Sequence, residues 1–300
     1  MMGSLPYHYF EPDQAAKLGG LQLVARTLVE GFISGLHRSP HHGFSAEFSE
    51  HRPYTPGDDL RHLDWVALAR TDRFFVKRYE RDTNLRAHVL LDISGSMDYG
   101  SGSLTKLQYG CYLAAMMAYL MVRQQDLVGL VCFDRRIRSY LAPGGSASHL
   151  DRLFGLLEQI RPGRTTSVST AFHDLAERIG KRGLVIVISD LYDDPAAVMR
   201  GLRHFRHRKH QVVVFHILDD AELHLPFSRL ASFVDKETGE RLQIDPKLIR
   251  DRYRREVEQF LTFIRRECND SAIDYLLANT TTSYHQTLRG YLASRRKVLH

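Results

Sequence analysis

Apolar segments and amphipathic segments alternate along most of the chain after residue 86. Stretches between and around the apolar segments have helical spacing, roughly 104–124, 148–160, 167–182 and 195–207. The apolar segments have the length and the β-branched composition of strands buried on both faces: 87–93, 127–133, 184–189 and 212–218. Strands and helices that alternate at this spacing predict a doubly wound, Rossmann-like α/β domain with a mainly parallel sheet and right-handed crossovers.

A different pattern precedes this domain. Apolar residues recur at three- and four-residue steps from 13 to 36, which is typical of an amphipathic helix. Two strand-like pieces, 44–48 and 74–79, flank a segment rich in turn formers and charge. The sequence therefore predicts an N-terminal helix and β arm over 1–85 and the α/β domain over 86–300. Within that domain we expect a hairpin around 236–240, a charged helix near 246–268, a strand at 272–278 and a last helix from 283.

Composition excludes several classes of protein. Of the 300 residues, 43% are hydrophobic and 25% are charged, so disordered and collagenous chains are excluded. The longest strongly apolar run, 112–122, falls short of the ~20 residues that a membrane-spanning helix needs. Residues 1–18 lack the basic start and apolar stretch of a signal peptide, so we expect a cytoplasmic protein with reduced cysteines. The net charge of +6 is a mild excess and identifies no partner by itself.

Side chains with oxygen donors gather where two of the predicted strands end. In doubly wound sheets, ligands bind outside the carboxyl ends of the strands, where the strand order reverses. Hydroxyls and carboxylates without Cys or His favour a hard cation such as Mg²⁺, with Mn²⁺ and Ca²⁺ as alternatives. The candidate ligands are Asp92, Ser94, Ser96 and Asp190, together with Thr165 or Thr166.

This set resembles the metal-ion-dependent adhesion site of the von Willebrand factor type A domain. That site reads Asp-x-Ser-x-Ser, then a Thr, then an Asp. The matching residues are Asp92, Ser94, Ser96, Thr166 and Asp190. Spacing to the following helix favours Thr166 over Thr165, and this chain has Ser167 where the family often has Asp. The resemblance implies a Mg²⁺-type site that engages an acidic side chain of a partner protein.

A second resemblance covers nearly the whole chain. Residues 51–65 read HRPYTPGDDLRHLDW and are followed by ARTD at 69–72 and VKRYE at 76–80. This arm resembles that of the bacterial family known as domain of unknown function 58, which carries a type A domain behind it. The resemblance implies an intracellular protein that works with a MoxR-type AAA+ ATPase in assembling or activating client proteins. We therefore expect a non-enzymatic, metal-dependent protein-binding module whose partner is such an ATPase or its client.

The arm carries charges of both signs around the only tryptophan of the chain. Internal ion pairs explain this pattern, because arginine pairs bidentately with carboxylates. A surface that recognises a partner is the other explanation. In that second case the candidate partner-binding residues are Arg52, Tyr54, Asp58, Asp59, Asp64 and Trp65.

Two other functions compete with protein binding. Asp92 could accept a phosphoryl group while Asp190 holds Mg²⁺, but such phosphatases use Asp-x-Asp, and Ser94 cannot act as the general acid. The basic cluster at 204–210 could contact phosphate, yet cations at a helix end are also typical of a solvated face. We keep Mg²⁺-dependent phosphotransfer through Asp92 as the alternative function and do not favour nucleic acid as a partner.

Overall fold

The chain divides into two compact units. In this computed structural model, the larger unit comprises Met1–Phe32 and Arg86–His300, and the smaller one comprises Ile33–Leu85. The structure describes residues 20–38, 48–53, 74–79, 85–163, 168–180, 182–235 and 239–298.

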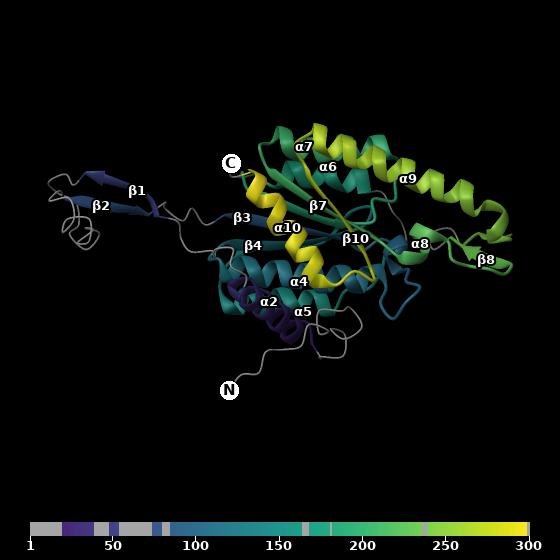
Figure 1. Ribbon diagram of the computed structural model, residues 1–300, viewed down its shortest axis with the longest axis horizontal. Helices are drawn as coiled ribbons and strands as arrows, with labels where there is room; N and C mark the ends of the chain where they lie inside the picture. The colour runs from purple at the N-terminus through teal and green to yellow at the C-terminus, as the bar shows by residue number, and fades with distance from the viewer. Residues whose placement is uncertain are drawn as a thin grey trace. The chain divides into compact units, whose positions relative to one another are not determined.

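A six-stranded sheet forms the centre of the larger unit (Figure 1). Its strands, in spatial order, are β10 (Asp274–Asn279), β7 (Gln211–Leu218), β6 (Leu184–Ser189), β3 (Arg86–Asp92), β4 (Leu127–Phe133) and β5 (Ile137–Gly144). All neighbours run parallel except β4 and β5, which pair antiparallel. After β3, the chain adds β4 and β5 on one side of that strand and then β6, β7 and β10 on its other side, as in a doubly wound sheet. The strand order therefore reverses between β3 and β6.

The central strands are continuous apolar runs because helices cover both faces of the sheet. Every residue of β6 is buried, as are the last six residues of β3. The predicted fold class, a doubly wound, mainly parallel α/β sheet, is confirmed. Strand β5 was not predicted, since it lies at the sheet edge and alternates half-buried with exposed residues instead of forming an apolar run.

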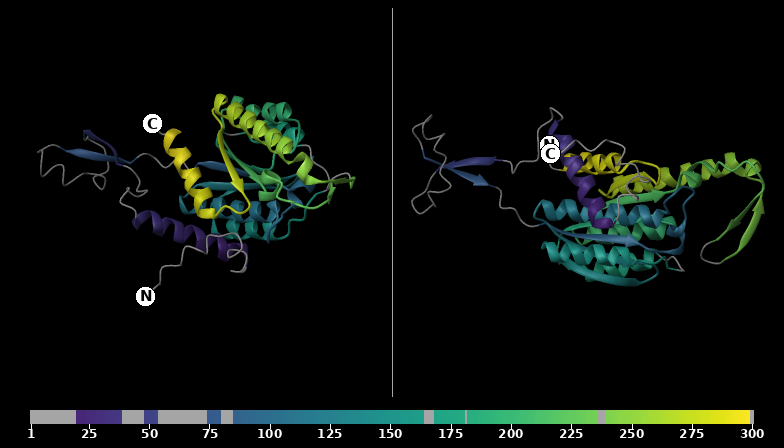
Figure 2. Two further views of the ribbon diagram at one scale, coloured as in Figure 1. Left: turned by 45° about the vertical axis from the view of Figure 1, so that its right-hand side comes forward. Right: turned by 90° about the horizontal axis from the view of Figure 1, so that it is seen from below.

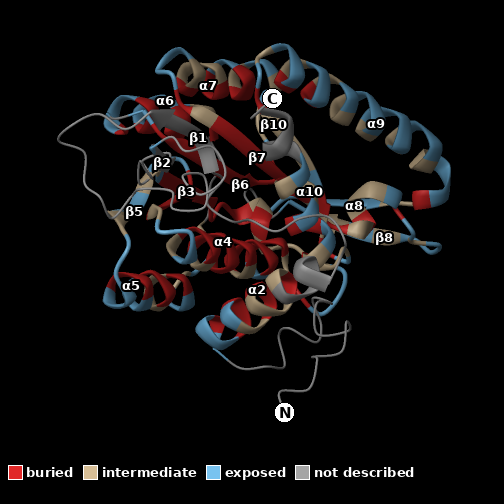
Figure 3. Cartoon of the chain, turned by 60° about the vertical axis from the view of Figure 1, so that its left-hand side comes forward, coloured by how far each residue is buried: buried red, intermediate tan, exposed pale blue. Residues whose placement is uncertain are grey.

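Two helix layers enclose the sheet (Figure 2). On one face lie α6 (Val168–Arg178), α7 (Pro195–His207) and α9 (Pro246–Asp270), whose apolar residues form one buried cluster with β3, β4, β6 and β7. The other layer contains α4 (Lys106–Arg123), α5 (Ala147–Glu158) and α10 (Tyr284–Val298). Helix α4 is buried on nearly every side (Figure 3), and a capping box between Thr105 and Gln108 fixes its start.

The N-terminal helix α2 (Leu21–Arg38) begins in the larger unit. Its buried residues include Val24, Leu28 and Phe32. The hydroxyl of Tyr119 on α4 donates a hydrogen bond to Glu30 over 2.8 Å. Residues 1–85, which the sequence grouped as one region, are thus divided between the two units, because the apolar face of α2 is buried within the larger one.

The smaller unit contains an antiparallel pair, β1 (Phe48–Pro53) and β2 (Phe75–Tyr79). Strand β2 was predicted at this position, whereas β1 shares only Phe48 with the predicted 44–48, and residues 44–47 lie outside the described residues. The polar residues of β1, FSEHRP, lack the apolar run that marks a strand. Arg52 lies in β1 opposite Val76. The other candidate partner-binding residues lie outside the described residues: Tyr54, Asp58, Asp59, Asp64 and Trp65.

Short elements lie beyond the carboxyl ends of the strands. They are the 3-10 helix η4 (Gly95–Asp98), helix α8 (Asp220–His224) and the antiparallel strands β8 (Ala231–Val234) and β9 (Arg241–Ile244), which form the predicted hairpin. In the part of the chain that the structure describes, no helix combines the length and apolarity that crossing a membrane requires.

Candidate functional site

The chain leaves β3 through a tight polar turn. Asp92 ends the strand and is fully buried. One of its carboxylate oxygens accepts a hydrogen bond from the backbone N–H of Ser94 at 2.8 Å, and the other accepts one from the hydroxyl of Ser189 at 2.6 Å. The hydroxyl oxygens of Ser94 and Ser96 lie 3.0 Å apart. The predicted Asp-x-Ser-x-Ser segment therefore places two hydroxyls together beside a buried carboxylate.

Asp190 follows β6, the strand next to β3. Its Oδ1 accepts a hydrogen bond from the backbone N–H of Tyr192 at 3.2 Å, and its Oδ2 lies 2.7 Å from the Nζ of Lys106. Because β3 and β6 are parallel neighbours, Asp92 and Asp190 lie at the same edge of the sheet, where the strand order reverses.

The two aspartates affect each other's ionisation. Burial and, after it, the negative charge of Asp190 raise the pKa of Asp92 to about 7, although the hydrogen bonds from Ser189 and Ser94 act to lower it. The ionised form of Asp92 is therefore costly in this environment. A cation bound next to the Asp92 carboxylate would stabilise this ionised form.

His216 on β7 contacts the backbone of Asp190. Its Nε2 lies 2.9 Å from the backbone oxygen of Asp190, and its Nδ1 lies 2.7 Å from the hydroxyl of Tyr275. Burial lowers the pKa of His216 to about 4, so the ring is neutral near pH 7. A neutral ring that donates through Nε2 and accepts through Nδ1 satisfies both contacts.

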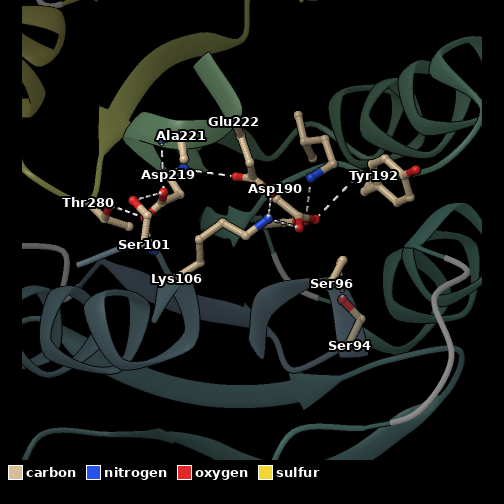
Figure 4. Close-up of polar contacts among 12 residues, drawn as sticks. Ser94, Ser96, Ser101, Lys106, Asp190, Tyr192, Asp219, Ala221, Glu222 and Thr280 are labelled. Carbon is tan, nitrogen blue, oxygen red and sulfur yellow. Dashed lines mark hydrogen bonds and ion pairs between the residues drawn. The ribbon is translucent and has the colours of Figure 1, made fainter. Parts of the chain in front are cut away.

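Lys106 was not predicted as a site residue. It is the first residue of α4, and its side chain is only 2% exposed. Its Nζ lies 2.7 Å from Asp190 and 2.6 Å from the Oε1 of Glu222 on α8 (Figure 4). Burial alone would lower the pKa of Lys106, but the two carboxylates outweigh burial and raise it. The sequence did contain a signal, because a lysine in the first turn of a helix opposes the helix dipole.

A third buried carboxylate of this edge, Asp219, directly follows β7. It accepts four hydrogen bonds, two from Ser101 and one each from the N–H of Ala221 and the hydroxyl of Thr280 (Figure 4). Burial acts to raise the pKa of Asp219, but these donors outweigh it and lower the pKa. Asp219 therefore ties together the loop before α4, the start of α8 and the end of β10, and its hydrogen-bonding capacity is used within the chain.

The donor set at Ser94 and Ser96 fits a small hard cation. Adjacent ligands of an octahedral Mg²⁺ with bonds of about 2.0–2.1 Å lie about 2.9 Å apart, close to the 3.0 Å between the two hydroxyls. Asp92 and Asp190 supply the negative charge that such an ion needs. The described residues contain no group of three or more His, Cys, Asp or Glu side chains that could hold a metal ion. A metal site here therefore depends on the serine hydroxyls. Thr165 and Thr166 lie outside the described residues.

Comparison with families and with curated proteins identifies relatives of this chain. Residues 50–260 match the family model described as "Protein of unknown function DUF58". The uncharacterized proteins Rv1480 of Mycobacterium tuberculosis and Mb1516 of Mycobacterium bovis are each 26% identical to this chain over 292 residues. Each alignment covers 96% of this chain and 91% of the relative.

Solved structures share parts of the architecture. The conserved hypothetical protein BatB from Bacteroides thetaiotaomicron is 16% identical with a TM-score of 0.49, over 71% of this chain and 99% of that one. The SpRpn10 VWA domain is 10% identical with a TM-score of 0.39, over 69% and 94%.

Proposed function

We propose that this chain, which belongs to the DUF58 family, is a protein-binding module. Its binding site lies at Asp92, Ser94, Ser96 and Asp190. The observation that carries this proposal is the pair of buried carboxylates, together with two serine hydroxyls 3.0 Å apart, where the strand order of the sheet reverses. In α/β sheets this is the place at which ligands bind.

A divalent cation, Mg²⁺ in the first place, joins the site to its partner in this proposal. The hydroxyls of Ser94 and Ser96 hold the ion, Asp92 and Asp190 supply charge, and Thr166 is the further ligand that the type A resemblance implies. Neutral hydroxyls leave part of the positive charge of the ion unbalanced. An acidic side chain of the partner is the group that this remaining charge attracts.

The partner that the family resemblance implies is a MoxR-type AAA+ ATPase or its client, bound in the cytoplasm. The arm at 51–80 is a second surface for the same partner, and Arg52 is its one candidate residue for which the structure describes a position. The role of the chain is then to present a client to the ATPase, or to recruit the ATPase, without chemistry of its own.

Phosphotransfer through Asp92 has no observation in its favour. The side chain is fully buried, and both of its oxygens accept hydrogen bonds, from Ser94 and Ser189. A nucleophile must reach a phosphorus atom and needs a general acid nearby. Ser94 occupies the position where Asp-x-Asp phosphatases have that acid.

Binding of the purified MoxR-type ATPase of the source organism to the immobilised chain tests the proposal. We expect the ATPase to bind in the presence of Mg²⁺ and to be released when a chelator is added. Ser96→Ala should lower the affinity at least about tenfold, which corresponds to ~1.4 kcal/mol of binding free energy. Ser101→Ala is the matched control, because Ser101 lies on the same edge but bonds to Asp219. Equal binding by all three proteins with and without Mg²⁺ would contradict a role for the metal site, and no binding by any of them would contradict this partner.

A further inference from the structure

We propose that Lys106 is an internal counter-cation of the site, which holds Asp190 in place of a metal and lowers the affinity of the site for divalent ions. This inference rests on the proposed function, because it concerns how the same site takes up its metal. It predicts that the metal competes with a positive charge that the chain itself supplies.

The position of Lys106 requires an explanation. A lysine that begins a helix stands where the helix dipole is positive, and a buried ammonium loses its hydration. Both effects disfavour this placement, yet the side chain is 2% exposed. The two contacts that offset these costs are those to Asp190 and Glu222, at 2.7 and 2.6 Å.

Glu222 is itself fixed by the surrounding scaffold. Its Oε2 accepts a hydrogen bond from the backbone N–H of Asp219 at 2.8 Å, while its backbone oxygen accepts one from the hydroxyl of Tyr253 at 2.7 Å. The other carboxylate oxygen, Oε1, is the one that contacts Lys106. The ammonium is therefore held between a carboxylate of the scaffold and a carboxylate of the candidate site.

The charge balance explains the effect on metal binding. Asp190 and Glu222 both contact Lys106, and Asp92 interacts with Asp190, so the ammonium neutralises one of these three negative charges. A divalent ion that approaches Asp190 meets the ammonium at hydrogen-bond distance from the same carboxylate. Repulsion between the two cations lowers the affinity unless the lysine moves away from Asp190.

Removal of the charge tests the inference. Lys106→Met alone leaves the buried carboxylate of Asp190 and the half-buried carboxylate of Glu222 without a cation and can fail to fold. The double variant Lys106→Met with Glu222→Gln removes one cation and one anion together. Glu222→Gln alone is the control that keeps the ammonium. For each protein we would measure Mn²⁺ affinity by electron paramagnetic resonance and the shift of the melting temperature on adding Mn²⁺.

We expect the double variant to bind Mn²⁺ at least about tenfold more tightly than the parent, the change that ~1.4 kcal/mol produces. Its melting temperature should also rise more on adding Mn²⁺. Glu222→Gln should show no such gain, and Ser96→Ala should abolish the gain in the double variant.

Two outcomes separate this inference from the proposed function. Equal, Ser96-dependent Mn²⁺ affinity in the parent and the double variant would overturn the role of Lys106 and leave the metal site intact. Absence of Mn²⁺ binding in every variant would overturn both the metal part of the proposed function and the inference drawn from it.

Discussion

Asp92 and Asp219 occupy comparable places in the fold but hold their charge in different ways. Both lie where a parallel strand ends, at the same edge of the sheet, and both are fully buried. Four donated hydrogen bonds outweigh burial at Asp219 and lower its pKa. At Asp92, burial and the charge of Asp190 dominate and raise the pKa to about 7.

The difference shows how a scaffold carboxylate can be told from a candidate binding carboxylate. Asp219 is satisfied by groups of its own chain, so an external cation would gain little there. The ionised form of Asp92 remains unfavourable after folding, so a cation would bind next to Asp92 more strongly than next to Asp219. The two aspartates should therefore respond in opposite directions when their charge is removed.

The largest effect is expected from Asp219→Ala. This change removes the acceptor of four hydrogen bonds and leaves donors on Ser101, Ala221 and Thr280 without it, of which Ala221 and Thr280 are buried. We expect a loss of about 4 kcal/mol in the free energy of unfolding. Urea denaturation measures it, with the exposed Asp251→Ala as a control that should stay within about 0.5 kcal/mol of the parent. A loss no larger than that of the control would contradict the structural role of Asp219.

Removal of the charge at Asp92 should act in the other direction. Asp92→Asn keeps the shape of the side chain and removes the repulsion with Asp190. In chelator at pH 8 we expect the variant to be more stable than the parent by about 2 kcal/mol, part of the cost that a raised pKa represents. The same denaturation experiment measures this gain. Destabilisation comparable to that of Asp219→Ala would mean that the two aspartates play the same role.

The gain from Asp92→Asn should depend on pH. Asp92 has a pKa of about 7 in the folded chain against 3.8 as the reference value, so the folded state holds its proton longer than the unfolded state. Its contribution to stability is present below pH 3.8 and is lost as the pH rises to about 7. The advantage of the variant over the parent should therefore shrink as the pH falls and vanish near pH 4. Denaturation curves between pH 4 and 8 would show an advantage that does not change with pH if this assignment is wrong.

A smaller effect is expected from His88, inside β3 and away from the site. Burial, and then the charges of His210 and Arg86, lower its pKa to about 4. Because the unfolded chain takes up this proton at a higher pH, stability is lost as the pH falls below 6.5. Between pH 7 and 5.5 we expect His88→Gln to lose about 1 kcal/mol less stability than the parent, because His216 and the other buried histidines titrate in both proteins. Parallel pH profiles of parent and variant would contradict this assignment.

The sequence predicted those parts of the molecule that depend on local pattern. The buried strands are continuous apolar runs. The alternating positions of Asp92, Ser94 and Ser96 predicted that these side chains would lie together, and the two serine hydroxyls are 3.0 Å apart. The parallel arrangement of β3 and β6 followed from the alternation of strands and helices, and it placed Asp190 on the same edge as Asp92.

The sequence could not predict contacts that depend on tertiary packing. Lys106 lies 84 residues from Asp190 and 116 from Glu222 along the chain, and Ser101 lies 118 from Asp219. These pairs meet because three strand ends and the start of α4 share one edge of the sheet. Since burial and hydrogen-bond donors decide the charge state, the sequence alone did not predict that the pKa values of Asp92 and Asp219 shift in opposite directions.

The most direct test of this account is a carbon-13 NMR titration of the aspartate carboxyl groups in metal-free protein, with Asp92→Asn and Asp219→Asn used to assign the two signals. We expect Asp92 to titrate near pH 7 and Asp219 below the ordinary range of an aspartate, and we expect Mg²⁺ to lower the midpoint of Asp92 while leaving that of Asp219 unchanged. Titration of both groups at the same pH, with no response of either to Mg²⁺, would contradict it.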